Sequence, residues 1–511
     1  MTLSGTLEGV RESKQSTKLQ ATDSASLRRS DLDGLRAIAV LFVVLYHASL
    51  PYLTGGYVGV DVFYVLSGFF ITGLLVREYE TKGSISLRNF YSRRLRRLLP
   101  AASLVLFTTA VLCWYVLPPL RMHDTSRQIT DAALNIANFN FAQSATNYLA
   151  VKDPSPVLHY WSLAVEEQFY LVWPFFVIGV LKFSRQRART SLFVAVLVVS
   201  LLSFASCVWL TYSNQPYAFF MFPTRAWELG LGALAVLGAQ RIMSWPSQVK
   251  IALGWLGLIS LMILGFTYTD RTVFPGYMAA LPALATVAVI SASGHAKGPS
   301  SVLSKRPLVA LGNWSYSIYL WHWPILVMVP LWLHRPCTLP ENLALVVLST
   351  ALAALTYRYW EIPIKDSHIL RISHLANFIV VFIVLFSSVA AAQALSSGSL
   401  RTLVSSADFA LNSVPKNLKV LLDASVKYEK LPKLFKPGLA DAKQDLPQST
   451  FDRCLLNWND TAIPECHYGT KVHTKKIVLF GDSHAEQWFP ALESIARKQK
   501  WQLTVLTKSA C

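Results

Sequence analysis

Residues 31–52 read DLDGLRAIAVLFVVLYHASLPY, an apolar run that is interrupted by Asp33, Arg36 and His47. A hydrocarbon core of about 30 Å is crossed by about 20 apolar helical residues, so this stretch predicts a membrane-spanning helix. An ionisable side chain inside such a helix is costly unless it is paired or faces a cavity. The stretch therefore predicts a membrane protein with a polar site inside it.

The composition of the whole chain agrees with this prediction. Of the 511 residues, 53% are hydrophobic and 15% are charged, whereas soluble domains carry about 25% charged residues. The mean hydropathy is +0.38, which excludes a disordered or fibrous protein. Apolar segments recur and predict a polytopic α-helical membrane protein of about eleven spans. These segments are residues 34–52, 58–76, 98–118, 160–181, 190–212, 224–240, 249–267, 276–292, 308–333, 341–360 and 373–396.

The basic residues test this topology, because cytoplasmic loops carry an excess of Lys and Arg. With the N-terminus inside, the inner segments hold 24 Lys and Arg residues and the outer loops hold 5. An odd number of spans then places the chain after Ser396 outside. The net charge of +18 is therefore mainly a topology signal, and we expect no nucleic-acid partner. The inner segments are residues 1–30, 77–97, 182–189, 241–250, 293–307 and 358–374.

The end of the chain differs in composition from the apolar spans. Residues 475–480 predict a buried strand, Gly481 to His484 a turn, residues 485–499 a helix interrupted by Pro490, and residues 501–507 a second strand. This is one β-α-β unit of a partial α/β domain. The expected parts of the chain are a disordered cytoplasmic tail (1–30), a ten-span domain (31–365), an extra span (366–396), an extracytoplasmic linker (397–470) and the start of the α/β domain (471–511).

Arg36 and His47 are 11 positions apart, which places them about 20° apart around a helix and about 16 Å apart along its axis. Two interpretations follow. Asp33 pairs with Arg36 at the interface while His47 makes one interhelical hydrogen bond, or the stripe forms a polar pore wall with a titratable imidazole partway across. In the next span, glycines such as Gly59 and Gly68 are explained by close helix packing, but Asp61 is not.

An arginine cluster follows that span at the inner face, made of Arg93, Arg94, Arg96 and Arg97. Anchoring of the topology explains such a cluster. Guanidinium groups also bind phosphate in a bidentate manner, so the cluster suits a ligand with several phosphates, such as coenzyme A. No H-E-x-x-H or Walker A stretch is present, and we expect no metal.

Further polar side chains lie on single faces of later spans, where helical neighbours are three or four residues apart. A structural polar network is one interpretation of them, and for the Arg225 and Glu228 pair it is the favoured one. A functional site is the other. These residues are His159, Ser162 and Glu166 in one span, Arg225 and Glu228 in another, and Ser315, Tyr319 and His322 in a third. Glu167 is a second acid that directly follows Glu166.

Together these stretches resemble the acyltransferase-3 family of membrane acyltransferases over residues 31–365, in the family's order. The Gly481-Asp-Ser-His484 block resembles the SGNH hydrolase-like domain that is often fused behind it. The fusion resembles the O-acyltransferases that acetylate bacterial surface polysaccharides such as O-antigen or peptidoglycan. The matching stretches are Asp33 to Arg36 with His47, Gly55 to Gly68, Arg93 to Pro100, His159 to Gln168, Arg225 to Gly230 and Trp314 to His322.

The resemblance implies a multi-pass protein of the bacterial inner membrane with a cytoplasmic N-terminus and a periplasmic or extracellular C-terminus. Arg36 and the arginine cluster would hold cytoplasmic acetyl-coenzyme A, which is a substrate and not a permanently bound cofactor. His47 would assist transfer outward to Ser483, the nucleophile that passes acetyl to a surface glycan. The competing interpretation is a transporter or permease, but transporters usually contain inverted repeats, and the two halves show no internal similarity.

The Ser483 segment departs from the SGNH pattern. That pattern supplies a catalytic His with an Asp three residues before it, yet only 28 residues follow Ser483, and none after His484 is Asp or His. His484 is a poor base for Ser483, because neighbouring side chains on a sharp turn diverge. We therefore expect an incomplete domain, in which Ser483 lies on a strand-to-helix turn without a His–Asp pair within reach.

The cysteines give one further prediction. Cys454 and Cys466 are 12 positions apart in the segment expected outside, where disulfides form, so we predict a local disulfide between them. Cys113, Cys207 and Cys337 lie in or beside spans and are expected to be reduced.

Overall fold

The computed structural model describes residues 29–117, 119–144, 154–184, 187–292, 294–404, 445–456, 464–470 and 474–508. The chain divides into two compact units, Met1–Ser399 and Leu400–Cys511. The expected tail, apart from its last two residues, and most of the expected linker lie outside the described residues.

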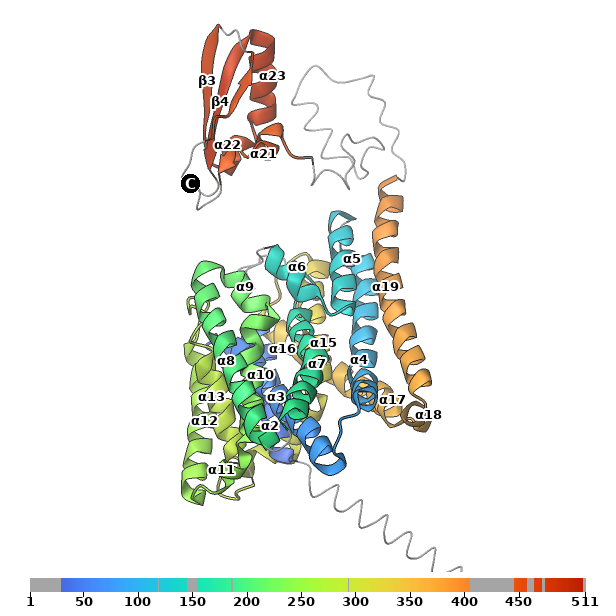
Figure 1. Cartoon of the computed structure of the whole chain (residues 1–511). Coiled ribbons are helices and arrows are strands. Elements are labelled where there is room, and N and C mark those ends of the chain that lie inside the picture. The colour runs from blue at the N-terminus through green and yellow to red at the C-terminus, as the bar shows by residue number, and fades with distance from the viewer. Residues whose placement is uncertain are drawn as a thin grey trace, which may run out of the picture. The chain divides into compact units, whose positions relative to one another are not determined.

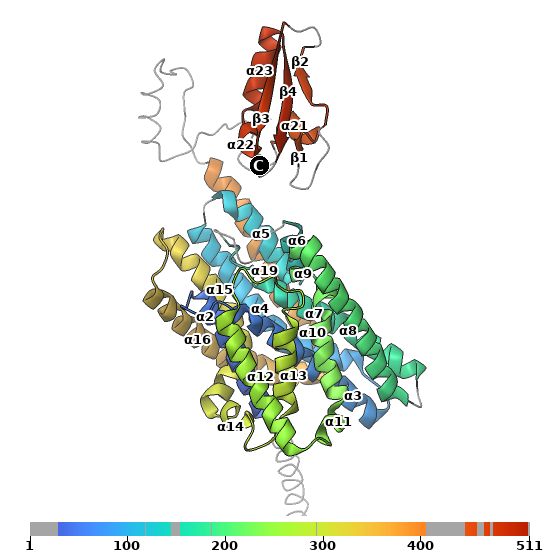
Figure 2. The same cartoon turned by 90° about the vertical axis from the view of Figure 1, so that its left-hand side faces the viewer.

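The first unit is a helical bundle (Figures 1 and 2). Its longer helices are α2 (Ser30–His47), α3 (Gly59–Lys82), α4 (Leu87–Val116), α7 (Tyr160–Phe183), α8 (Ala188–Ser213), α12 (Ser247–Thr267), α15 (Arg306–Leu333), α16 (Leu339–Thr356) and α19 (His374–Val404). The shorter elements are η1 (Gly56–Val58), α5 (Pro119–Ala133), α6 (Ala137–Gln143), α9 (Gln215–Phe220), α10 (Phe222–Leu237), α11 (Ala239–Met243), α13 (Ala280–Ser291), α14 (Ser300–Leu303), η3 (Tyr357–Glu361), α17 (Ile362–Asp366) and α18 (His368–Ile372).

The polytopic helical fold is confirmed. Fewer helices than the eleven predicted spans, however, meet a criterion of length and apolar composition for crossing a membrane. Among the described residues, 8 helices are long and apolar enough to cross a membrane. The other three predicted spans are helices α2, α10 and α13. Helix α2 has Asp31, Asp33 and Arg36 in its first turns, and α10 and α13 have 16 and 12 residues. Most of α10 is buried against neighbouring helices, so its surface is covered by protein rather than by lipid.

Segments expected inside and outside lie at opposite ends of the bundle. Figure 1 shows α11, α17 and α18, from the expected inner segments, toward one end. Helices α5, α6 and α9, from the expected outer loops, lie toward the other end. The alternation that the Lys and Arg count predicts is therefore present in the structure.

Glycines set the closest helix crossings. A Cβ atom on Gly312 of α15 would lie 1.8 Å from the Asp33 carbonyl oxygen of α2. A Cβ on Gly68 of α3 would lie 1.8 Å from the Leu229 carbonyl oxygen of α10. The predicted packing role of Gly68 is confirmed, and the Gly312 crossing brings the polar stripe of α2 onto α15.

The second unit holds a four-stranded sheet of β1 (Leu455–Leu456), β2 (His467–Gly469), β3 (Lys475–Gly481) and β4 (Trp501–Lys508). Its helices are α21 (Gln448–Phe451), α22 (Ser483–Glu486) and α23 (Phe489–Gln499). Strands β3 and β4 are parallel, from Lys475 opposite Trp501 to Gly481 opposite Thr507. This is the predicted β-α-β unit, and Pro490 lies in the first turn of α23, where proline is tolerated.

Strands β1 and β2 correct the predicted domain boundary at residue 471. Both fall in the segment predicted to be a linker, because strands of two and three residues carry no readable alternation. They pair with the edge of β4 that lies opposite β3. The predicted disulfide between Cys454 and Cys466 is present beside these strands. Cys113, Cys207 and Cys337 are free, as expected, and Cys511 lies outside the described residues.

Candidate functional site

A cavity of about 810 Å³ lies among α2, α3, α4, α7 and α15. Along α3 its wall runs from Val60 to Leu74, a length of about 21 Å at 1.5 Å per residue. The cavity is therefore long enough to suit an extended ligand. All five arginines predicted to bind the donor line it: Arg36, Arg93, Arg94, Arg96 and Arg97.

The charge of the cavity wall favours an anionic ligand. Seven basic side chains and three acidic ones line it, which is a formal excess of four positive charges. Lys365 and Arg371 add to the five arginines, and the acids are Asp33, Glu166 and Glu361. The sequence prediction missed Lys365, Arg371 and Glu361, because no motif marked them. The only available signal was their position within the basic inner segment 358–374.

The four arginines of α4 differ in what they contact. The Arg96 side chain is buried, and its Nη1 donates a hydrogen bond to the Leu370 carbonyl at 2.6 Å. Arg93 forms an ion pair with Glu78 at 3.4 Å. These two arginines therefore also tie α4 to neighbouring segments.

Arg94 and Arg97 are the more available members of the cluster. The Arg94 guanidinium lies 4.4 Å from the centroid of the Tyr170 ring, a cation–π contact. Arg97 is exposed and, within the part of the chain that the structure describes, makes no hydrogen bond or ion pair. Arg36 forms an ion pair with Asp33 at 3.9 Å and also lines the cavity. It is therefore both a member of the expected ion pair and part of a polar wall.

Two hydroxyl groups form the wall at the end away from the arginine cluster. The Tyr319 hydroxyl and Ser162 Oγ are 2.6 Å apart, and both residues line the cavity. The Tyr319 hydroxyl also lies 3.1 Å from the His159 carbonyl oxygen. The Tyr64 hydroxyl donates to the Ser162 carbonyl at 3.3 Å, which fixes the backbone behind this pair.

Three histidines lie behind the hydroxyl pair. His47 Nδ1 is 3.0 Å from His322 Nε2, and the two rings stack with centroids 5.2 Å apart. His159 Nε2 lies 3.2 Å from the Leu320 carbonyl oxygen. His47 therefore makes the interhelical hydrogen bond of the first interpretation and does not itself line the cavity. The sequence indicated each histidine separately but not their meeting.

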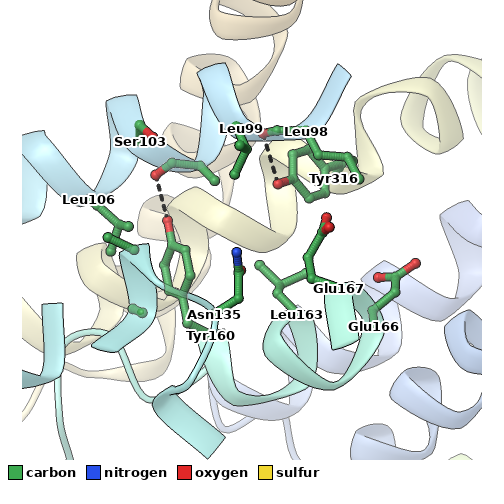
Figure 3. Close-up of a pocket in the computed structure, with 13 residues that line it drawn as sticks. Leu98, Leu99, Ser103, Leu106, Asn135, Tyr160, Leu163, Glu166, Glu167 and Tyr316 are labelled. Carbon is green, nitrogen blue, oxygen red and sulfur yellow. Dashed lines mark hydrogen bonds between the residues drawn. The ribbon is translucent and has the colours of Figure 1, made fainter. Parts of the chain in front are cut away.

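Glu166 and Glu167 occupy neighbouring positions with different surroundings. Glu166 lines the large cavity and accepts hydrogen bonds from Ser67 and Tyr170. Glu167 lines a smaller cavity of about 20 Å³, shown in Figure 3, whose wall includes Glu166 and Tyr316 as well. Four residues line both cavities, namely Glu166, Tyr316, Leu98 and Leu163.

The remaining predicted network splits into two groups. Ser315 lines the large cavity. Arg225 forms ion pairs with Asp61 at 3.2 Å and Glu228 at 2.8 Å, and all three side chains are at most 1% exposed. This closed cluster fits the structural interpretation of Arg225 and Glu228, and it provides a partner for Asp61.

Ser483 lies on the predicted strand-to-helix turn. Gly481 has φ of 149°, and a Cβ there would lie 2.8 Å from the Ala485 side chain, so this turn requires glycine. Asp482 caps α22 by accepting from the backbone N–H groups of Ala485 and His484. These bonds, with the imidazole of His484, hold the pKa of Asp482 below its ordinary value.

The Ser483 hydroxyl has no base beside it. It is exposed, and no described residue forms a hydrogen bond with it. The His484 imidazole is 83% exposed and faces Asp482 at 3.3 Å. The prediction that Ser483 lacks a His–Asp pair within reach is confirmed for the described residues. In those residues there is also no group of three or more His, Cys, Asp or Glu side chains that could hold a metal.

Comparison with known families gives two matches. The model of an acyltransferase domain, in the acyltransferase-3 family, matches residues 29–358. The model of an SGNH domain that is fused to such domains matches residues 453–511.

Curated relatives match over about two thirds of the chain. One is "Putative peptidoglycan O-acetyltransferase YrhL" of Bacillus subtilis (strain 168), 33% identical over 346 residues, which is 65% of this chain and 54% of the relative. Another is O-acetyltransferase OatA of Staphylococcus aureus (strain NCTC 8325 / PS 47), 33% identical over 352 residues, which is 65% of this chain and 57% of the relative. The chain thus spans somewhat more than half the length of these relatives. No solved structure matches.

Proposed function

The chain belongs to the acyltransferase-3 family of membrane acyltransferases, and from this premise we propose that it transfers an acyl group, acetyl first of all, from a coenzyme A thioester to a hydroxyl of a cell-surface glycan. The observation that carries the proposal is the large cavity. Its basic end suits the phosphates of coenzyme A, and its other end presents hydroxyl groups backed by histidines.

The donor would lie along the cavity. Its phosphates would bind Arg97 and the neighbouring basic side chains, because guanidinium groups bind phosphate oxygens in a bidentate manner. Its extended arm would pass the apolar part of the wall, which includes Phe63, Phe70 and Leu74. The thioester would then reach the hydroxyl pair of Tyr319 and Ser162.

The chemistry at that end requires a base and a hydroxyl nucleophile. The nucleophile oxygen forms a bond to the thioester carbon, the carbon–sulfur bond breaks, and the coenzyme leaves as a thiolate that takes up a proton. From its place behind the hydroxyl pair, His47 would accept the proton of the attacking hydroxyl, since a neutral imidazole nitrogen carries the lone pair that a general base uses. The Tyr319 hydroxyl, which donates to the His159 carbonyl, would turn its hydrogen toward the thioester carbonyl oxygen as that oxygen gains negative charge.

The acyl group would then move outward. In this proposal the N-terminus is cytoplasmic, the second unit is extracytoplasmic, and the membrane is the bacterial inner membrane. Once a base reaches it, Ser483 would accept the acyl group and pass it to the glycan, which splits one transfer into two. Peptidoglycan is the first acceptor to test, because the Bacillus subtilis relative is named for it.

The test uses inverted membrane vesicles that contain the full chain and radiolabelled acetyl-coenzyme A. We expect the thioester to be consumed, and the Arg97→Ala variant to need a higher donor concentration. Arg241→Ala is the matched control, because Arg241 is an exposed arginine of an inner segment that does not line the cavity. Equal donor dependence in both variants would contradict the proposed donor site.

The same assay separates the enzyme from the transporter interpretation. A transporter would move its substrate across the vesicle membrane without consuming the thioester. Mass spectrometry of surface glycans from cells with and without the gene then identifies the acceptor. Unchanged acetylation of every glycan would contradict the proposed acceptor class.

A further inference from the structure

The contacts of His322 determine which of its ring nitrogens carries hydrogen. His322 Nδ1 lies 2.7 Å from the Tyr319 carbonyl oxygen and 3.2 Å from the Ile318 carbonyl oxygen. A carbonyl oxygen only accepts hydrogen bonds, so Nδ1 must be the N–H that donates to it. His322 is fully buried, and within the described chain no carboxylate forms an ion pair with it. An unpaired buried charge is unfavourable, so the ring is neutral.

A neutral imidazole carries one hydrogen, so the other nitrogen of His322 must be an acceptor. That nitrogen, Nε2, lies 3.0 Å from His47 Nδ1. His47 Nδ1 is therefore the donor of this hydrogen bond. In neutral His47 the remaining nitrogen, Nε2, then carries the lone pair that a general base needs.

His159 is not part of this hydrogen-bonded pair. Its Nε2 lies 3.2 Å from the Leu320 carbonyl oxygen, so this nitrogen is a donor. Its Nδ1 is buried and has no hydrogen-bond partner among the described residues. The His47 ring is held from another side by Trp323, whose ring centroid lies 4.5 Å away in an edge contact. The pair of His47 and His322 is thus a defined arrangement within the cluster.

We infer that His322 is a positioning residue that holds His47 in the tautomer with hydrogen on Nδ1 and the lone pair on Nε2. The inference rests on the proposed function, because it concerns the base of that reaction. When His47 takes a proton, His322 Nε2 continues to accept from its Nδ1–H, and a hydrogen bond from a charged donor is stronger than one from a neutral donor. His322 thus orients the base and stabilises its protonated form, as the third group of a catalytic triad does.

Two substitutions separate positioning from mere packing. In His322→Gln, the amide oxygen can accept from His47 and the amide N–H can donate to the Tyr319 carbonyl. In His322→Leu, the acceptor is lost. We expect His322→Leu to lower kcat by about 100-fold, the lower range for loss of general base catalysis, with KM for acetyl-coenzyme A unchanged, because His322 does not line the cavity.

His322→Gln is expected to retain kcat within about tenfold of the wild type, well above His322→Leu, because its amide supplies both hydrogen bonds. Trp321→Phe is the matched control for stability of α15, since it removes a buried hydrogen bond to Thr356 in which no histidine takes part. Equal loss of kcat in the Gln and Leu variants would overturn the inference, and so would a change confined to KM.

Nuclear magnetic resonance of histidine-labelled protein in lipid bilayers gives a measurement that does not depend on activity. Carbon and nitrogen shifts distinguish the two tautomers, and the His47 signal is assigned by its absence in His47→Gln. We expect the Nδ1–H tautomer in the wild type and its loss or mixing in His322→Leu. An Nε2–H tautomer of His47 in the wild type would overturn the inference. If the Nδ1–H tautomer is present but no thioester is consumed, the proposed function fails instead.

Discussion

Asp61 and Glu228 share a single guanidinium group, that of Arg225, in the interior of the first unit. With both carboxylates ionised, the cluster would hold one uncompensated negative charge at sites that are at most 1% exposed. Such a charge is strongly unfavourable in a protein interior. We therefore expect one of the two carboxyl groups to hold a proton, so that the cluster is neutral.

This charge count gives the first prediction. Glu228→Gln removes the surplus carboxyl, so its thermal unfolding in detergent should resemble that of the wild type. Arg225→Met leaves carboxyl groups without a cation and should destabilise the unit by about 3–5 kcal/mol, the usual effect of breaking a buried ion pair. Arg189→Met breaks a partly exposed pair with Glu80 and serves as the control, with an effect below about 1 kcal/mol. An Arg225→Met variant as stable as this control would contradict the assignment.

A second prediction compares two arginines one position apart on α4. Arg97→Ala should weaken acetyl-coenzyme A binding by about tenfold, because a hydrogen bond to a charged group contributes about 1.5–3 kcal/mol. Arg96→Ala should weaken donor binding and, unlike Arg97→Ala, should also lower thermal stability, because it removes the hydrogen bond to the Leu370 carbonyl. Titration calorimetry and thermal unfolding of both variants check this. Equal donor affinity in Arg97→Ala and wild type would be the contrary result.

At the scale of elements, the β3–α22 turn presents a serine whose hydroxyl contacts no base among the described residues. A serine hydroxyl is a weak nucleophile until a base takes its proton. We expect a fluorophosphonate probe to leave Ser483 of this chain unlabelled in the native protein, as judged by peptide mass spectrometry. The Ser483→Ala variant gives the background. Labelling of Ser483 above that background would show that a base reaches it.

The disulfide between Cys454 and Cys466 joins the segments that carry β1 and β2. In the chain-entropy model, closing a loop of about 12 residues contributes about 3 kcal/mol. The double variant Cys454→Ser, Cys466→Ser should therefore be cut by protease in the second unit at lower concentrations than the wild type. Cleavage in the first unit is the internal control and should not change. Equal resistance of the second unit would mean that the sheet holds without this bridge.

At the scale of the whole molecule, the topology predicts where a reporter is active. Alkaline phosphatase folds only outside the cytoplasm, so we expect a fusion after Ser405, beyond α19, to be active. A fusion after Ser373, just before α19, should be inactive and is the matched control. This expectation rests on the Lys and Arg residues, of which the inner segments hold 24 and the outer loops hold 5. The opposite pattern would reverse the proposed orientation.

Local signals in the sequence were enough to predict the apolar helices and the unit of β3 and β4, but not the short strands β1 and β2. Each predicted span is helical because apolar length is a local property, and β3, the turn at Ser483 and β4 follow from a short apolar run bounded by glycine. The disulfide between Cys454 and Cys466 was also predictable, because its partners are close in sequence. The cluster of Arg93, Arg94, Arg96 and Arg97 was found for the same reason, since these residues are close together on one helix.

Tertiary structure alone decided how distant residues combine. His47 and His322 are 275 positions apart, Asp61 meets Arg225 from another helix, and Lys365 and Arg371 complete the cavity from a segment without a motif. Helical spacing shows which side chains share a face but not which helix that face contacts. That choice depends on where backbones approach most closely, as where Gly312 of α15 meets Asp33 of α2. Packing of whole helices, rather than residue spacing, therefore assembled the site.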